Sequence, residues 1–166
     1  MRINKKSFIL IVITIAVISA VIYFKPREID TEYNGIMYRL GDADYSENIK
    51  IKISGYLTKG VFKGDKFRGN IIIGGKERSG LLIEFDDSHR GLLYYLDRYT
   101  GESEVYNIIS ENLEKEITLC VLEKNGHGSS WSEGDGLMIS APADNRKQAL
   151  EISKRLIGNL ANNELK

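Results

Sequence analysis

The most unusual segment of the sequence, NGHGSSWSEGDG at 125–136, combines four glycines and three serines with the sole tryptophan and one of the two histidines. His127 lies close to Ser129 and Ser130, which suggests a general base beside a hydroxyl nucleophile. Residues so near in sequence do not easily adopt triad geometry, and the G-x-S-x-G elbow of many hydrolases is missing. We therefore expect no acyl-transfer site in this segment.

The same segment offers metal-ligating atoms from His127, Glu133 and Asp135. A glycine-rich loop with a single histidine fits neither the calcium-loop spacing nor the zinc patterns. The sequence therefore predicts no metal site here, and no other motif indicates a cofactor.

A binding role is the functional interpretation of this segment. Trp131 could stack on a sugar or enter a pocket of a partner, with His127 and Asp135 beside it. Long loops without structure are uncommon in compact domains and are often functional. In the alternative interpretation, the segment only connects two strands, and Trp131 folds back onto the rim of the domain.

A second cluster, Asp86-Asp87-Ser88-His89, places carboxylates, a hydroxyl and an imidazole in one turn. Aspartate and serine also favour turns for structural reasons, because their side chains bond to the nearby backbone. A hydrolase would require a pocket that brings His89 or His127 to an aspartate or glutamate in the folded chain. The sequence alone assigns no catalytic residue, and an enzyme is not the favoured interpretation.

Tyrosines are frequent between residues 94 and 106, where adjacent strands could offer a stacking platform for carbohydrate. Tyrosine is also common in strands for packing reasons alone. The candidate binding residues from this region and from the glycine-rich segment are His127, Trp131, Asp135, Tyr94 and Tyr95.

The elements that must position these residues are mainly strands. From 36 to 141 the apolar residues follow a period of two, most clearly in NIKIKISGYL at 48–57, where Ile51 and Ile53 alternate with Lys50 and Lys52. Further strands are expected at 65–74, 81–85, 92–99, 104–109, 116–123 and 137–141. Seven or eight short strands predict a mainly β (α+β) fold, an antiparallel meander forming a sandwich or a partly open barrel.

The last element is an amphipathic helix expected over 145–160, which follows Pro142. Its apolar residues fall on one side of a helical wheel, and Asn145 with Gln148 has the spacing of a capping box. We expect this helix to pack on the sheet and cover apolar surface there.

An unbroken apolar run, FILIVITIAVISAVIYF at 8–24, stands between basic flanks. As a helix it spans roughly 25 Å, at the short end of what crosses a bilayer core. Cleavage after Ala20 as a secretory signal would leave Ile18 at a position that requires a small residue. We expect an uncleaved, single-pass signal anchor whose partner is the lipid bilayer.

Flanking charge orients the expected anchor, because basic residues stay in the cytoplasm. Three basic residues precede the run, whereas acidic residues dilute the two that follow it. The expected parts are a cytoplasmic basic tail at 1–7, the transmembrane anchor at 8–24, a polar linker at 25–35 and an extracytoplasmic β domain at 36–166.

The composition narrows the function classes. The chain balances 23 basic against 23 acidic residues, and their signs alternate along it, so no positive face for nucleic acid is expected. One cysteine, Cys120, cannot form an internal disulfide, and its apolar surroundings indicate a buried small residue. The fold must depend on apolar packing.

Two stretches, VFKGDKFRGNIIIGG at 61–75 and GLMISAPADNRKQALEISKRLI at 136–157, resemble those of small single-pass membrane proteins of spore-forming Gram-positive bacteria. The resemblance implies an amino-terminal anchor and an export-side domain that ends in a strand and a helix. It implies no activity and no functional residues.

Three functions remain open from the sequence. The favoured one is an extracytoplasmic β domain that binds an envelope protein or glycan at the bacterial cell envelope. The second is an envelope-associated hydrolase that uses His89, His127 and loop carboxylates. The third is a subunit of a membrane complex assembled through the transmembrane helix, where the small residues Ala16 and Ala20 are spaced for close helix packing.

Overall fold

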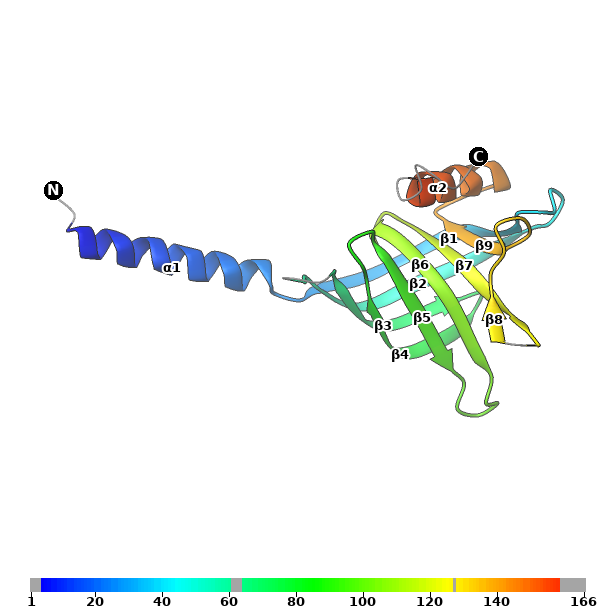
Figure 1. Ribbon diagram of the computed structural model, residues 1–166, viewed down its shortest axis with the longest axis horizontal. Coiled ribbons are helices and arrows are strands. Elements are labelled where there is room, and N and C mark those ends of the chain that lie inside the picture. The colour runs from blue at the N-terminus through cyan, green and yellow to red at the C-terminus, as the bar shows by residue number, and fades with distance from the viewer. Residues whose placement is uncertain (1–3, 61–63, 127, 159–166) are drawn as a thin grey trace.

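The computed structural model describes residues 4–60, 64–126 and 128–158 (Figure 1). In these residues the fold is mainly β, as the sequence predicted, with the strands placed between two helices. Helix α1 (Lys5–Tyr23) projects away from the strands, and helix α2 (Arg146–Gly158) lies against their outer side.

The strands pair antiparallel throughout the described residues. They are β1 (Arg27–Arg39), β2 (Ser46–Thr58), β3 (Lys66–Ile73), β4 (Lys76–Glu84), β5 (Arg90–Leu96), β6 (Ser103–Asn112), β7 (Glu116–Asn125), β8 (Gly128–Ser130) and β9 (Leu137–Ala141). The order across the sheet is β4-β3-β2-β1-β9-β7-β6-β5, with β8 paired to the end of β7.

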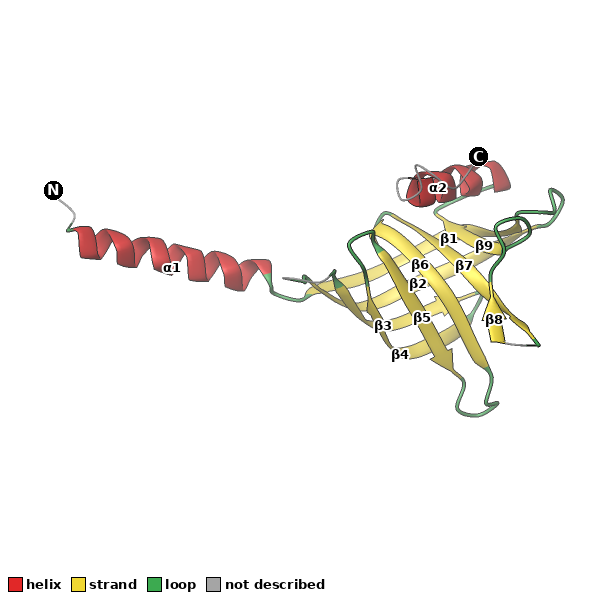
Figure 2. Ribbon diagram, viewed as in Figure 1, coloured by secondary structure: helices red, strands yellow, loops and turns green. Residues whose placement is uncertain are grey.

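The sheet curls into a nearly closed barrel (Figure 2). Its two ends in the strand order, β4 and β5, meet at a single bridge between Phe85 and Gly91. Among the described residues no further pairing joins these two strands. The sandwich that the sequence left open is therefore not formed, and a gap between β4 and β5 interrupts the barrel.

The barrel interior is a packed core. The alternation in β2 is as predicted, because Ile51 and Ile53 are buried inside whereas Lys50 and Lys52 are exposed. Apolar side chains from the strands fill the interior, including Phe67, Leu93 and Leu119. A barrel of about eight strands is just wide enough for side chains to fill or for one small ligand. Here the side chains occupy that space.

A second apolar cluster lies outside the barrel, between the sheet and α2. It combines outward-facing Tyr38 and Met138 from the strands with Ala149, Ile152 and Leu156 from α2. Strands β1, β7 and β9 are therefore buried on both faces, which explains continuous apolar runs such as LMISA at 137–141. The predicted packing of the helix on the sheet is confirmed.

The start of α2 has the predicted cap. The Asn145 Oδ1 accepts a hydrogen bond from the Gln148 N–H at 3.0 Å. The Gln148 Oε1 in turn accepts from the Asp144 N–H at 2.8 Å, one residue before the position in a standard capping box. These bonds satisfy two backbone donors at the helix start.

The segment 25–35, expected as a linker, instead contributes most of β1. Ile29 is fully buried and Tyr33 is nearly so, while the intervening Asp30 and Glu32 are exposed. The acidic residues on the outer face made the segment look like a linker, although its inner face follows the period of a strand.

Part of the glycine-rich segment 125–136 is also more ordered than expected. Residues Gly128–Ser130 form β8, which pairs with the end of β7 through Glu123–Ser130 and Lys124–Ser129. The connection from β7 to β9 thus begins as a short hairpin and continues as a loop through Trp131.

Helix α1 covers the apolar run, and its N-cap is Asn4, whose Oδ1 accepts from the Lys6 N–H at 3.3 Å. Judged by length and mean hydropathy, no helix within the described residues qualifies as membrane-spanning. The span expected over 8–24 therefore stays a prediction.

Candidate binding site

A groove of about 860 Å³ lies between α2 and the outer face of the sheet. We call it the outer groove. Its floor consists of the outward-facing side chains of Leu92, Asn107, Ile109, Cys120 and Met138. Its wall consists of Leu150, Ser153, Lys154, Ile157 and Gly158 of α2.

The outer groove exists because the apolar arc of α2 is wider than the surface that the helix covers. Ala149, Ile152 and Leu156 pack directly onto the sheet and are buried. Leu150 and Ile157, on the flank of the helix, are only half-buried and face the groove. Of the apolar side chains in the groove, Leu92 on the floor and Leu150 and Ile157 on the wall are left in contact with solvent, whereas Ile109, Cys120 and Met138 are buried.

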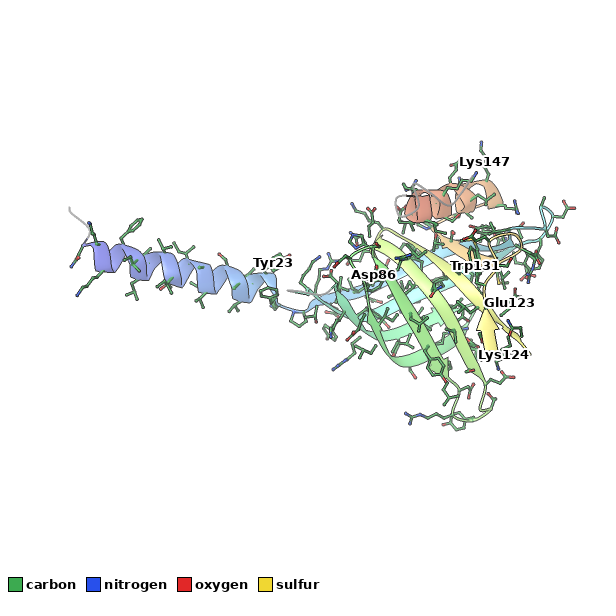
Figure 3. The ribbon with its side chains drawn as sticks, viewed as in Figure 1. Tyr23, Asp86, Glu123, Lys124, Trp131 and Lys147 are labelled. Carbon is green, nitrogen blue, oxygen red and sulfur yellow. The ribbon has the colours of Figure 1, made fainter. Side chains whose placement is uncertain are left out.

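Charged side chains form the rim of the groove. Glu84, Asp86 and Arg90 lie where β4 turns into β5, and Glu133 and Lys154 lie along the other sides. In Figure 3, Asp86 lies toward the α1 end of the barrel and Trp131 toward the β8 end. An apolar floor with a polar rim is the usual composition of a site for an organic ligand or a partner segment.

Asp86 is organised by its own turn. Its Oδ1 accepts from the backbone N–H groups of Ser88 at 2.8 Å and of Arg90 at 2.9 Å. Burial raises the pKa of the Asp86 carboxyl, but these bonds and the Arg90 charge outweigh it and leave the pKa below its usual value. Asp86 therefore stays ionised near neutral pH, and the turn has the structural role that the sequence left open.

Trp131 closes one end of the outer groove together with Leu40. Its ring is half-buried, and its indole N–H is buried without a hydrogen-bond partner in the part of the chain that the structure describes. The ring lies directly over Gly136, where an added Cβ would collide with it. Trp131 is thus folded onto the domain, as in the structural interpretation, and shapes the groove rather than projecting from it.

Asp135 holds the end of the loop to the barrel. Its backbone carbonyl accepts from Arg39 Nη1 at 2.9 Å, and its carboxylate lies 3.5 Å from the same guanidinium. Arg39 also donates two hydrogen bonds to Glu123 on β7, at 3.0 and 2.7 Å. The contacts of Asp135 are structural, and His127 lies outside the described residues.

Tyr94 and Tyr95 point to opposite faces of β5. Tyr94 faces outward and is 57% exposed, whereas Tyr95 packs against the barrel core. These two residues therefore cannot share one stacking platform. Tyr94 instead stands in an outward row with Leu92 and Leu96, which we call the β5 stripe.

His89 and the glycine-rich segment lie at opposite ends of the barrel. His89 lies at the α1 end, where it lines a second cavity of about 560 Å³ with Tyr23 and Lys59. Its carbonyl accepts from the Ser110 N–H, near the start of the β6–β7 hairpin. From there β7 runs roughly 30 Å to Asn125 at the other end. His89 shares its cavity with the carboxylates of Asp65 and Glu111, which is the proximity that the hydrolase alternative requires of one histidine. His127 lies outside the described residues, so the hydrolase stays an alternative prediction.

Cys120 in the groove floor is a poor nucleophile. Burial raises its thiol pKa to about 12, so the reactive thiolate is scarce at neutral pH. Behind it, Tyr38 donates to Ser153 at 2.8 Å, and Ser140 bonds to Thr118 at 3.0 Å. These buried hydroxyls bond to one another. Within the described ranges, no group of three potential metal ligands occurs.

The groove residues were largely missed from the sequence. Leu150 and Ile157 were expected simply to cover the sheet, and Leu92 was expected to be an ordinary strand residue. A signal was present in LLYYL at 92–96, which is apolar at every position although β5 is an end strand of the sheet. Such a run indicates apolar side chains on the outer face as well as the inner one.

No protein-family model, no curated protein and no solved structure matched the chain.

Proposed function

We propose that the protein is a membrane-tethered binding module at the bacterial cell envelope, and that its outer groove holds an apolar segment of another envelope protein. One observation carries the binding part of this proposal. The barrel interior is filled by its own side chains, whereas the groove beside α2 exposes apolar side chains, Leu92, Leu150 and Ile157, to solvent.

The chemistry of the groove favours binding over catalysis. Its volume falls within the range of about 300 to 1,000 Å³ that is usual for ligand sites. Its one thiol has a raised pKa, and Asp86, one of its three rim carboxylates, accepts two backbone hydrogen bonds. We favour a protein segment over a glycan, because Trp131 is half-buried with the nitrogen edge of its ring against Gly136 and does not project from the domain.

The tether is supported by the character of α1. The helix lies away from the barrel (Figure 1), and its apolar side chains are exposed on all sides. A helix that is apolar all round requires burial, either in a protein core or in lipid. Although no helix of the described residues qualifies as membrane-spanning by length and mean hydropathy, the 19 residues of α1 extend about 28 Å at 1.5 Å per residue, close to the thickness of a bilayer core.

The short junction determines where the binding surface would stand. Helix α1 ends at Tyr23 and β1 begins at Arg27, so the α1 end of the barrel would rest near the lipid headgroups. Under this arrangement the outer groove lies on the side of the barrel. It would be open to partners that are themselves held at the membrane.

Site-specific photocrosslinking in intact membranes tests the proposal. A photoreactive residue replaces either Lys154, which lines the groove, or Lys147, which is exposed on the outer side of the same helix (Figure 3). We expect a discrete protein adduct from position 154 and none from position 147. The same adducts from both positions, or none from position 154, would contradict a partner in the groove.

A further inference from the structure

The free edge of β5 is a second feature next to the outer groove. On one side β5 pairs with β6 along its length, from Arg90–Ile109 to Leu96–Ser103. On the other side, the described residues give it only the bridge from Gly91 to Phe85. The backbone beyond Gly91 therefore presents unpaired hydrogen-bonding groups toward the gap, as edge strands do.

The opposite edge of the gap is protected, and β5 is not. Strand β4 begins with the charged Lys76 and Glu77 and is bent by a register shift beside Gly80, whose φ is +68°. Charges and bulges of this kind discourage pairing with another chain. The β5 segment at 92–96 contains neither a charge, a proline nor a glycine. Of the two described edges that border the gap, the β5 edge is the one suited to accept another strand.

The outer face of this edge is apolar. In the β5 stripe, Leu92 is 54% exposed, Tyr94 57% and Leu96 48%, and Leu82 on the facing strand β4 is 53% exposed. A strand laid along β5 would bring its own outward side chains beside this row, where apolar cross-strand pairs are stabilising.

The inner side of the gap is polar instead. Arg78 of β4 reaches Glu104 of β6 at 2.7 Å and the Tyr106 hydroxyl at 2.9 Å. Lys76 adds a 2.7 Å contact to Glu104. This network joins β4 to β6 by side chains where backbone pairing stops. An added strand would therefore meet apolar groups outside and polar groups inside.

The tether argues against a second copy as the added strand. Two identical strands that pair antiparallel are related by a two-fold axis perpendicular to both. That rotation turns the second barrel end over end, so its α1 would point away from the bilayer that holds the first. Pairing of two β5 edges is thus incompatible with anchoring in one membrane.

We propose that the β5 edge accepts an extended segment of another protein by strand addition, with apolar side chains facing outward and polar ones inward. This inference deepens the proposed function and rests on it. Backbone hydrogen bonds to β5 would supply the affinity, and the β5 stripe would select the pattern of side chains.

The test uses the full chain in phosphatidylcholine nanodiscs and a defined probe. The probe is a fluorescent peptide of alternating valine and threonine, about as long as β5. Its matched control carries backbone N-methyl groups, which remove hydrogen-bond donors but keep the side chains. We expect the control to bind at least about tenfold more weakly than the unmodified probe. Amide exchange should slow in β5 only with the unmodified probe.

Two tyrosine variants locate the site. Tyr94→Lys places a charge on the β5 stripe, whereas Tyr56→Lys places one at a similarly exposed position (55%) on the interior strand β2. We expect Tyr94→Lys to weaken probe binding by about tenfold or more and Tyr56→Lys to leave it unchanged. Both variants should retain the wild-type melting temperature, because neither side chain is buried.

The outcomes separate the two proposals. Equal binding of the N-methylated control, or no binding of the probe, overturns strand addition. If strand addition failed in this way, photocrosslinked protein adducts at position 154 and none at position 147 would continue to support a partner in the outer groove.

Discussion

At the scale of single residues, the network around Arg78 is the most consequential polar feature of the fold. The guanidinium is almost fully buried and also lies 5.4 Å from the centre of the Tyr106 ring. Burial raises the pKa of the Glu104 carboxyl. The hydrogen bonds from Lys76 and Tyr106 and the charge of Arg78 outweigh that effect, so the pKa lies below its usual value. The network thus keeps a carboxylate ionised inside the β4–β5 gap.

Arg78→Met should destabilise the protein by about 2 kcal/mol at pH 7, because Glu104 and the Tyr106 hydroxyl lose their hydrogen bonds from the guanidinium although Lys76 still contacts Glu104. A carboxyl with a lowered folded pKa contributes stability above its unfolded pKa of about 4.3 and loses it as the pH falls through the folded value. The difference between wild type and variant should therefore shrink on acidification below about pH 4. Urea titrations of both proteins across this range measure it.

Arg68→Met is the matched control, since Arg68 is exposed on β3. It should change the free energy of unfolding by less than about 0.5 kcal/mol. If Arg78→Met lowered the free energy of unfolding as little as Arg68→Met does, or lowered it more in acid than at pH 7, the network would not stabilise the barrel.

At the scale of elements, helix α2 creates the candidate site by covering only part of the outer sheet. Its position depends on the cap at Asn145, which the sequence identified through its spacing to Gln148. Without a firm start to the helix, the wall residues Leu150 and Ile157 would not stand at a fixed distance from the groove floor.

Asn145→Ala should lower the free energy of unfolding by about 1 kcal/mol, because the N-cap side chain satisfies an otherwise unpaired backbone donor. Thermal unfolding followed by circular dichroism measures the effect. Lys147→Ala, an exposed change in the first turn of the same helix, should be nearly neutral. Equal stabilities of the two variants would mean that the observed cap does not hold the helix.

The sequence predicted those elements that are specified by residues close together in the chain. Alternation in β2 and the cap of α2 depend on residues near one another in the chain, so their patterns are readable. The inner face of β1 was obscured by exposed Asp30 and Glu32. The outer groove was not predictable, because it requires knowing that β5 ends the sheet and that α2 stops short of covering it. Both facts come from long-range pairing.

At the scale of the whole molecule, the proposed arrangement is a filled barrel held at the outer surface of the bilayer by α1. The turn between β5 and β6 projects from the barrel away from α1 (Figure 1), and its Tyr99 is fully exposed. The native Cys120, in contrast, is buried and has a strongly raised thiol pKa. An introduced thiol at position 99 would therefore be the reactive one.

The central claim is that the barrel faces the outside of the cell, and thiol labelling tests it most directly. Tyr99→Cys is expressed in intact bacterial cells and treated with a membrane-impermeant maleimide, with the wild-type chain as the control. The account predicts labelling of Tyr99→Cys in intact cells and none of the wild type. Labelling of Tyr99→Cys only after the cells are broken would contradict it.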